Sequence, residues 1–481
     1  VERLIRMRKY KISNFKVIKR GSKIIIYISE NNSVFEPSLK KITGFLLEFL
    51  SNYKGKFIDE DELKVGLTRY KLNDRVLREF FEIGLVNDKV RGFTNKTDYI
   101  KCLKFNPASL VLVVSKNCNL RCKYCYKSNY IIQHDKSEFM DLKTALKSVD
   151  YFFEQQNDER EKKIIFFGGE PLLNFKLIKE TVSYVEKKYI SKGKNIKFII
   201  TTNGTLINKE IASYLIDKKF SICISIDGNE KINNQNRVYK NGRGCYLDSL
   251  NGYKCIKDIN SEYPVAVRAT VTRQTNCLSE IYKHLKNLGF FEVGVAPASI
   301  EPDSELKLSD SDLKNMLEEI KKLSEEYFND ISNYVYPKFS NLTNMLSLLH
   351  KGDSFSFPCG ACLGLVAVDP DGKLYPCHRL SFDKFEIGNL SDGIDERKRE
   401  LFLERALDCR NEKCSNCDIQ YLCSGGCYYE SEVTYNNWYY PNIHYCDFMK
   451  GVSEIAMELY AKIHDNYPKF LDFLTNECNQ L

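Results

Sequence analysis

Three thiols lie close together in the segment 115–126, directly after the apolar run 110–114. They are Cys118, Cys122 and Cys125. Cysteines at this CxxxCxxC spacing can hold three irons of a cubane iron–sulfur cluster and leave the fourth iron without a protein ligand. That iron is then open to a small molecule. A zinc knuckle or three unrelated buried thiols are the alternatives, but zinc normally takes four ligands that include CxxC pairs.

With Tyr124 just before its last cysteine, the segment resembles the signature of the radical S-adenosylmethionine (SAM) superfamily. The resemblance implies that the open iron chelates SAM and that the reduced cluster cleaves it to a 5'-deoxyadenosyl radical. Gly168-Gly169-Glu170-Pro171 stands at the end of the next apolar run and resembles the superfamily's GGE motif. The two glycines allow close approach of the backbone to a ligand. In the superfamily this backbone and the Glu receive the SAM amino group.

Two further residues are expected at SAM through the same resemblance. Ser225 ends another apolar run, and Arg237 follows twelve residues later. In related peptide maturases a Ser and an Arg at this separation contact the ribose and carboxylate of SAM, and an Arg fork suits a carboxylate well. A surface salt bridge is the alternative for Arg237. Asn203 and Tyr124 are expected beside the adenosine on the resemblance alone.

A second set of cysteines lies between residues 359 and 446. Its spacing resembles the SPASM extension of radical SAM enzymes, which binds two auxiliary [4Fe–4S] clusters and would bring the total to three. By position, the first auxiliary cluster would take Cys359, Cys362, Cys377 and Cys427, and the second would take Cys414, Cys417, Cys423 and Cys446. Some members of the family leave one iron of the first cluster open to substrate, and Cys409 is an alternative to Cys359. A pair of zinc sites is the structural alternative.

The elements that must position these residues alternate between strand and helix after about residue 110. Apolar runs are separated by amphipathic stretches such as 142–153 and 207–216, which favours parallel βα units. The runs are 110–114, 164–167, 198–200, 222–224, 265–267 and 293–295. Six units predict an α/β fold with a partial (β/α)6 barrel of TIM type. Because chemistry in such barrels lies at the carboxyl ends of strands, the cysteine motif and residues 168–171, 201–204 and 225–228 should converge on one mouth.

The first hundred residues have a different pattern. Residues 23–29 and 33–36 predict a β-hairpin, and the periodic stretches 42–50, 59–70 and 74–83 predict three helices. This order resembles the winged-helix-like element with which peptide-modifying enzymes hold the leader of a precursor peptide. A generic winged helix or interaction domain is the alternative. The predicted domains are 1–100 for leader recognition, 101–308 for the barrel, 309–354 for a helical bridge and 355–481 for a SPASM domain.

Composition limits the class of protein. The 481 residues include 18 cysteines, and the charged start has no features of a signal peptide. This favours metal or redox chemistry in the cytoplasm over a disulfide framework. A net charge of +7, without a basic stripe interleaved with aromatic residues, gives no indication of nucleic acid binding, and no apolar run is long enough to span a membrane.

The residue after Cys377 bears on the reaction. Anaerobic sulfatase maturases, which are related through the SPASM group, carry a catalytic Asp there, whereas this chain has His378. The run 369–379 resembles maturases of ribosomally made, cysteine-rich peptides, including thioether-forming enzymes of sactipeptide and ranthipeptide type. Maturases of quinohemoprotein amine dehydrogenase share the Pro-Cys-His sequence. His378 is either a proton acceptor near the site or a hydrogen-bond donor to a cluster sulfur.

The sequence therefore predicts a radical SAM maturase of a ribosomal precursor peptide. In this hypothesis the deoxyadenosyl radical removes hydrogen from a peptide carbon, which then bonds to a cysteine sulfur, and an auxiliary cluster binds that thiolate or takes the second electron. The leader would add as a strand to the hairpin 23–36, and flavodoxin or ferredoxin would donate electrons. Carbon–carbon cross-linking and epimerisation need the same motifs. A non-catalytic iron–sulfur carrier or sensor would need neither the GGE motif nor the pair Ser225 and Arg237.

Overall fold

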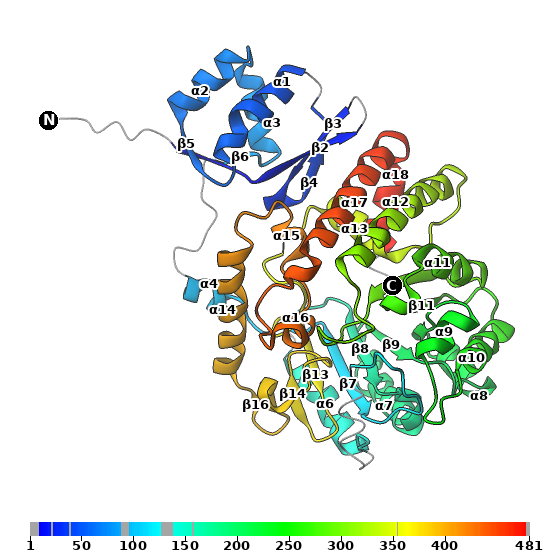
Figure 1. The fold of residues 1–481 in the computed structure, drawn as a ribbon. Helices are drawn as coiled ribbons and strands as arrows, with labels where there is room; N and C mark the ends of the chain where they lie inside the picture. The colour runs from blue at the N-terminus through cyan, green and yellow to red at the C-terminus, as the bar shows by residue number, and fades with distance from the viewer. Residues whose placement is uncertain are drawn as a thin grey trace.

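The protein is described from a computed structural model covering residues 9–20, 23–37, 40–87, 96–126, 138–155, 158–353 and 355–477. A ten-stranded sheet forms its centre, in the order β12-β11-β10-β9-β8-β7-β13-β14-β15-β16 (Figure 1). Two three-stranded sheets lie near the N-terminus. The helices of the described residues include none that is both long and apolar enough to cross a membrane.

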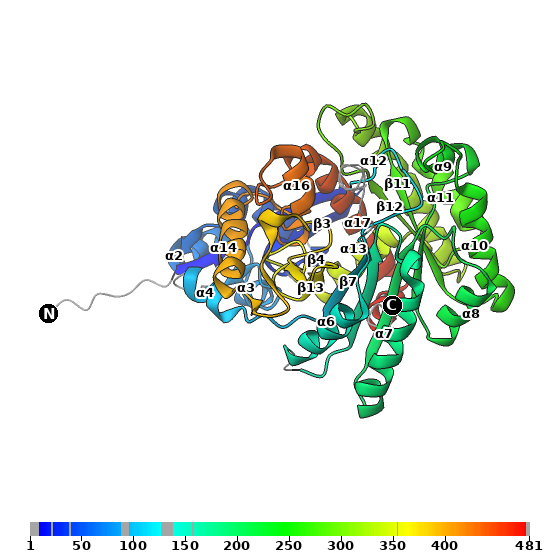
Figure 2. The same cartoon turned by 90° about the horizontal axis from the view of Figure 1, so that it is seen from below.

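Six parallel strands of the central sheet correspond to the six predicted apolar runs. They are β7 (Ser109–Ser115), β8 (Lys162–Gly168), β9 (Ile196–Thr202), β10 (Ser221–Ser225), β11 (Val265–Val271) and β12 (Glu292–Pro297). Helices follow the strands and cover one face of the sheet (Figure 2). They are α6 (Leu142–Glu154), α7 (Phe175–Lys188), α8 (Lys209–Asp217), α9 (Glu230–Asn236), α10 (Tyr246–Ile259) and α11 (Leu278–Asn287). The prediction of parallel βα units is confirmed.

Alternation within the strands separates the two faces of this sheet. In β8, Ile164 and Phe166 are fully buried in the main hydrophobic core, whereas Ile165 and Phe167 between them are only half-buried. Side chains alternate between faces along a strand, so the half-buried rows line the inner face of the partial barrel. That face is where the polar residues of the site lie.

The second cysteine region begins as an extension of the barrel sheet. Strand β13 (Leu365–Val368) pairs with β7 in parallel, and β14 (Lys373–Tyr375), β15 (Gly388–Asn389) and β16 (Gly393–Ile394) continue in antiparallel register. The helices around it are α14 (Glu396–Lys413), α15 (Gln420–Cys423), α16 (Tyr428–Tyr435), α17 (Cys446–Asn466) and α18 (Pro468–Glu477). The predicted bridge contains α12 (Asp310–Ser332) and α13 (Ser340–Lys351). Helix α12 begins with a capping box at Ser309.

The N-terminal part contains the predicted hairpin and more. Strands β3 (Lys23–Ile28) and β4 (Ser33–Phe35) pair in antiparallel register, and β2 (Phe15–Arg20) adds to the other edge of β3. A second sheet consists of β5 (Phe57–Asp59), β1 (Lys9–Ile12) and β6 (Val86–Asn87). The predicted helices are α1 (Lys40–Gly44), extended by π and 3₁₀ turns to Tyr53, α2 (Glu60–Arg69) and α3 (Asp74–Glu82). Helix α4 (Lys96–Cys102) leads into the barrel.

Strand β3 joins the N-terminal part to the rest of the chain. Ile26 and Ile28 belong to a separate small core, whereas Ile25 and Tyr27, on the opposite face, belong to the main core. The side chain of Asn32 donates a hydrogen bond to the carbonyl of Asp353. One face of β3 therefore packs in the core of the N-terminal part, and the other face packs against the rest of the chain.

Candidate active site

The loop 115–126, here called the cysteine loop, lies at the carboxyl end of β7. Its backbone is pinned by hydrogen bonds from Arg121 N to Val238 O (2.6 Å) and from Lys123 N to Asn236 O (3.0 Å). Lys116 at its start is salt-bridged to the buried Asp369, which follows β13, at 3.0 Å. The loop is thus fixed to the barrel on one side and to the second cysteine region on the other.

Gly168 and Gly169 are required by close contact with this loop. A Cβ on Gly168 would lie 2.0 Å from the carbonyl oxygen of Ser115, and one on Gly169 would lie 2.2 Å from that of Asn117. The same carbonyls accept hydrogen bonds of 2.8 Å from Gly169 N and Glu170 N. The glycines therefore allow close backbone approach to the cysteine loop, and their approach to a ligand remains a prediction.

The Glu170 carboxylate is fully buried and bound to protein donors. It accepts hydrogen bonds from Thr202 Oγ1 (2.7 Å), Asn203 N (2.8 Å) and Leu172 N (3.0 Å). Burial raises its pKa. Pro171 is the first residue of a 3₁₀ turn, Pro171–Asn174, where its missing N–H costs nothing. In this arrangement Glu170 positions the end of β9, and its predicted contact with the SAM amino group remains a prediction.

Asn203 reaches from the end of β9 into the cysteine loop. Its Nδ2 donates to Asn119 Oδ1 at 2.9 Å and to the Cys118 sulfur at 3.8 Å. The backbone N–H of Leu120 also donates to that sulfur, at 3.4 Å. The N–H groups of Asn203 and Leu120 therefore both donate to the Cys118 sulfur, an arrangement that suits a negatively charged thiolate.

A buried network holds the last part of the loop. The Tyr124 hydroxyl donates to Asp227 Oδ2 at 2.5 Å and accepts from the Arg237 guanidinium at 2.7 Å. Arg237 also lies 3.7 Å from Asp227 Oδ1, which accepts from Thr270 N. Burial raises the pKa of Asp227, and Arg237 opposes this increase. Arg237 is 7% exposed, so it is no surface salt bridge, and one of its nitrogens already serves Tyr124.

The three loop thiols fit a metal-bound group. Burial raises the pKa of Cys118 and of Cys122 to about 12, with a further contribution from the neighbouring Cys125. Free thiols with such pKa values are protonated at neutral pH, and binding to iron would release those protons. No three His, Cys, Asp or Glu side chains within the described ranges lie close enough to hold a single metal ion. Three thiols at this spacing can supply one thiolate to each of three irons of a cluster.

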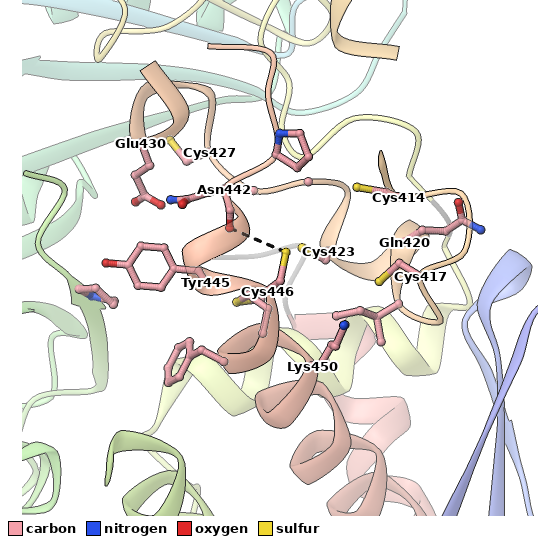
Figure 3. Close-up of a pocket in the computed structure, with 17 residues that line it drawn as sticks. Cys414, Cys417, Gln420, Cys423, Cys427, Glu430, Asn442, Tyr445, Cys446 and Lys450 are labelled. Carbon is pink, nitrogen blue, oxygen red and sulfur yellow. Dashed lines mark hydrogen bonds between the residues drawn. The ribbon is translucent and has the colours of Figure 1, made fainter. Parts of the chain in front are cut away.

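Five thiols of the second region line a cavity of about 240 Å³ (Figure 3). Four of them, Cys414, Cys417, Cys423 and Cys446, are those predicted for the second auxiliary cluster and are here called the cavity thiols; the fifth is Cys427. Burial, with the neighbouring thiols, raises the pKa of Cys414 to about 11. The side chain of Asn442 also lines this space, and neither its Nδ2 nor its Oδ1 has a partner among the described residues. These residues fit the predicted second auxiliary cluster.

The four thiols predicted for the first auxiliary cluster also lie near one another. Burial, with smaller contributions from Cys359 and Cys427, raises the pKa of Cys377 to about 12. Burial likewise raises the pKa of Cys362, and Cys377 and Cys359 add to it. The groups that affect the pKa of Cys409 include no other cysteine. Cys359 therefore lies close enough to Cys377 and Cys362 to affect their pKa values, and the choice between Cys359 and Cys409 as a ligand remains a prediction.

His378 lies against the barrel wall. Its ring centroid is 4.0 Å from that of Phe167, the residue before the two glycines. The next residue, Arg379, joins the two cysteine regions: its guanidinium donates to the Cys427 sulfur at 3.5 Å and lies over the Tyr126 ring at 5.3 Å. Motif reasoning missed Arg379 because no spacing marks it, although it directly follows the Pro-Cys-His sequence. It also missed Asp227, which lies within the strand-end segment 225–228 that had been noted.

Residues 112–271 match the family model described as the radical SAM superfamily. The chain is 26% identical over 362 residues to a cysteine-type anaerobic sulfatase-maturating enzyme of Clostridium novyi (strain NT), covering 72% of this chain and 94% of that one. It is 24% identical over 415 residues to the radical SAM cyclopropyl synthase TigE of Paramaledivibacter caminithermalis, covering 79% and 81%.

Two solved structures share the fold. One is anSMEcpe with bound AdoMet, which is SAM, and the Cp18Cys peptide, with 23% identity, coverage of 74% of this chain and 99% of that chain, and a TM-score of 0.64. The other is Streptococcus suis SuiB bound to the precursor peptide SuiA, with 16% identity, coverage of 90% and 99%, and a TM-score of 0.52. Residues 112–271 are therefore a radical SAM domain. Over most of its length the chain is similar to enzymes that are named as sulfatase-maturating enzymes and as a cyclopropyl synthase.

Proposed function

We propose that the chain modifies a ribosomally made precursor peptide and forms a thioether to a cysteine of that peptide. The observation that carries the proposal is the convergence of the cysteine loop, the GGE segment and the second cysteine region on one end of one sheet. Strand β13 pairs directly with β7, and Lys116 bridges their ends through Asp369. A catalytic iron site and a second set of iron ligands would then face the same substrate.

In this proposal Cys118, Cys122 and Cys125 hold a [4Fe–4S] cluster. When bound, that cluster supplies the electron that cleaves SAM to a 5'-deoxyadenosyl radical. The chain's own residues prepare the place: Glu170 fixes the end of β9, and Asn203 turns a donor toward the Cys118 sulfur. Ser225 at the end of β10 is assigned to SAM, and His378 on the barrel wall is assigned to proton transfer beside the peptide.

The peptide's leader is assigned to the N-terminal part, residues 1–100, and the peptide's core to the barrel mouth. In the sheet β2-β3-β4 both edges of β3 are already paired, which leaves the outer edge of β4 for strand addition on the predicted hairpin. SuiB, which shares the fold, has been solved with a precursor peptide. The two auxiliary clusters, the eight cysteines assigned to them and a flavodoxin or ferredoxin donor belong to the same proposal.

The first experiment asks whether the protein is catalytic. Anaerobically purified protein is reduced in the presence of SAM, and 5'-deoxyadenosine is measured. We expect turnover by the wild type and none by Cys118→Ala. Absence of deoxyadenosine from the iron-loaded wild type would favour a non-catalytic carrier or sensor and contradict the proposal.

The second experiment identifies the bond. The protein is co-expressed anaerobically with the small cysteine-containing reading frame nearest its gene, and the peptide is weighed before and after thiol alkylation. A loss of two hydrogens per bond, with the affected cysteines no longer alkylated, is the expected result. The same loss with all thiols reactive would replace thioether formation by carbon–carbon cross-linking. Unchanged mass with altered residue stereochemistry would indicate epimerisation.

A further inference from the structure

Arg268 occupies an unusual position on the inner face of the barrel. It lies on β11, in register with Ser225 of β10 and Gly294 of β12. Register partners in parallel strands point to the same side of the sheet. Its neighbours Val267 and Ala269 are buried on the outer face. Arg268 therefore shares its row and its face with Ser225, the residue assigned to SAM.

The Arg268 side chain has no internal partner. Within the described part of the chain it makes no hydrogen bond or ion pair, and it is exposed. Surrounding protein nevertheless lowers its pKa, and the nearby Cys223, Arg379 and Glu430 also affect the pKa. The side chain is thus exposed on the inner face of the barrel, with Cys223, Arg379 and Glu430 in its surroundings.

The acidic group that affects the pKa of Arg268 is engaged with other residues. Glu430 accepts a hydrogen bond of 2.8 Å from Ser299 and lies 3.6 Å from the guanidinium of Arg379. Arg379 in turn donates to Ser299 at 2.7 Å and stacks over Tyr429 at 4.7 Å. Arg379 therefore has hydrogen-bonding partners and an ion-pair partner within the described residues, whereas the Arg268 side chain has neither.

Gly294 provides the space in which Arg268 lies. A Cβ on Gly294 would stand 2.8 Å from the Arg268 Nη1 atom and 3.4 Å from its Cδ. The guanidinium therefore extends over the backbone of β12. A guanidinium forms its strongest paired contacts with a carboxylate, and the Arg268 guanidinium has no such partner within the described residues.

We propose that Arg268 is the binding residue for a substrate carboxylate inside the barrel, with Gly294 as the open floor beneath its guanidinium. The inference rests on the proposed function, because that function places SAM and a peptide in this space. Both can supply a carboxylate: SAM through its amino acid group, and the peptide through an acidic side chain or its carboxyl terminus. Arg237, the other arginine expected to bind the SAM carboxylate, is already hydrogen-bonded to Tyr124 and ion-paired with Asp227.

The test is modification of arginine by phenylglyoxal in the full chain, mapped by mass spectrometry. Arg268 should react, whereas Arg379, enclosed by its contacts, is the internal control that stays protected. N-acetyl-glutamate amide should slow the reaction at Arg268, and N-acetyl-glutamine amide should not. Protection by SAM, but neither by decarboxylated SAM nor by the glutamate derivative, would assign the carboxylate to SAM. The proposal is overturned if no carboxylate slows the reaction, or if Arg268 reacts no faster than Arg379.

Two variants give an independent measurement. Arg268→Gln should weaken binding of the protecting carboxylate about tenfold, the effect of losing one charge-assisted hydrogen bond. Gly294→Ala should give a smaller loss, because it displaces the guanidinium without removing it. Equal affinity of both variants and the wild type would contradict the proposal. Labelling and binding are measured on the iron-loaded protein and require no reduction or turnover, so their failure is distinct from failure of the deoxyadenosine assay.

Discussion

The cysteine loop is held by the barrel's own backbone and side chains, whereas the cavity thiols surround a space that the described residues do not fill. Around the loop, the carboxylates of Glu170 and Asp227 have hydrogen-bonded partners within the protein. Around the cavity, both polar atoms of the Asn442 side chain lack partners among the described residues. If the two regions hold the clusters proposed for them, we expect the fold to preform the first site and the second site to depend on the group that it binds.

Removal of iron should have the largest effect and should separate the two regions. Structural metal sites contribute on the order of 10 kcal/mol of folding free energy, measured for small zinc domains. In protein stripped of iron anaerobically with a chelator, amide hydrogen exchange in residues 414–446 should approach that of an unfolded chain. Strands β7 and β8 and the cysteine loop should keep most of their protection.

The iron-loaded protein, handled in the same way without chelator, is the control for this experiment. If the cysteine loop lost as much protection as residues 414–446, the proposed difference between preformed and ligand-dependent sites would be wrong. Unchanged exchange in both regions would show that the cavity needs no bound group for its stability.

Arg237→Met should have the next largest effect, because it breaks the network that preforms the first site. Removing one partner of a buried ion pair costs about 3–5 kcal/mol, since the other charge is left uncompensated. Here the remaining charge is Asp227, which is 1% exposed. Unfolding in urea should show this loss of stability.

Arg243→Met is the matched control for that variant. Arg243 is exposed and pairs with Asp248 at 2.7 Å, so its loss should cost at most about 1 kcal/mol. The double variant Arg237→Met with Asp227→Asn should recover part of the lost stability, since no buried charge then remains. Equal losses for Arg237→Met and Arg243→Met would show that the network does not hold the loop.

The sequence was sufficient for the barrel but not for the contacts within it. The six runs of apolar residues predict the six parallel strands, because each run is buried on the face that packs against helices. Strands β1, β5 and β6 were not predicted, since they are short and pair with segments distant in sequence. Strand β2, which pairs with the neighbouring β3, was also missed. Sequence predicted that Gly168 and Gly169 let the backbone approach a ligand, whereas the structure shows their close approach to the cysteine loop.

Side-chain partners were the least predictable part of the site. Spacing marked Arg237 as a possible carboxylate fork, whereas the structure buries it with Tyr124. The neighbouring residues do not predict that Arg237 is buried and hydrogen-bonded whereas Arg268 is exposed. The position of Arg268 depends on strand register and on the missing side chain of Gly294. Such relations depend on residues far apart in the chain, which periodicity and motif spacing do not describe.

Gly169→Ala should have the smallest effect on stability and the most local consequence. The added methyl group would press on the Asn117 carbonyl, and the loop would have to move, at a cost of about 1–3 kcal/mol. Gly364→Ala is the matched control, since a Cβ there meets nothing within 4 Å and neither glycine has a positive φ. We expect Gly169→Ala to lose iron from the cysteine loop while retaining the iron bound by the second region, as measured by iron content and by the electron paramagnetic resonance of each cluster. The cavity thiols lie in a part of the chain separate from the cysteine loop. A loss of iron from both regions would therefore mean that the two sites form as one unit. The two sites would then differ in geometry but not in stability.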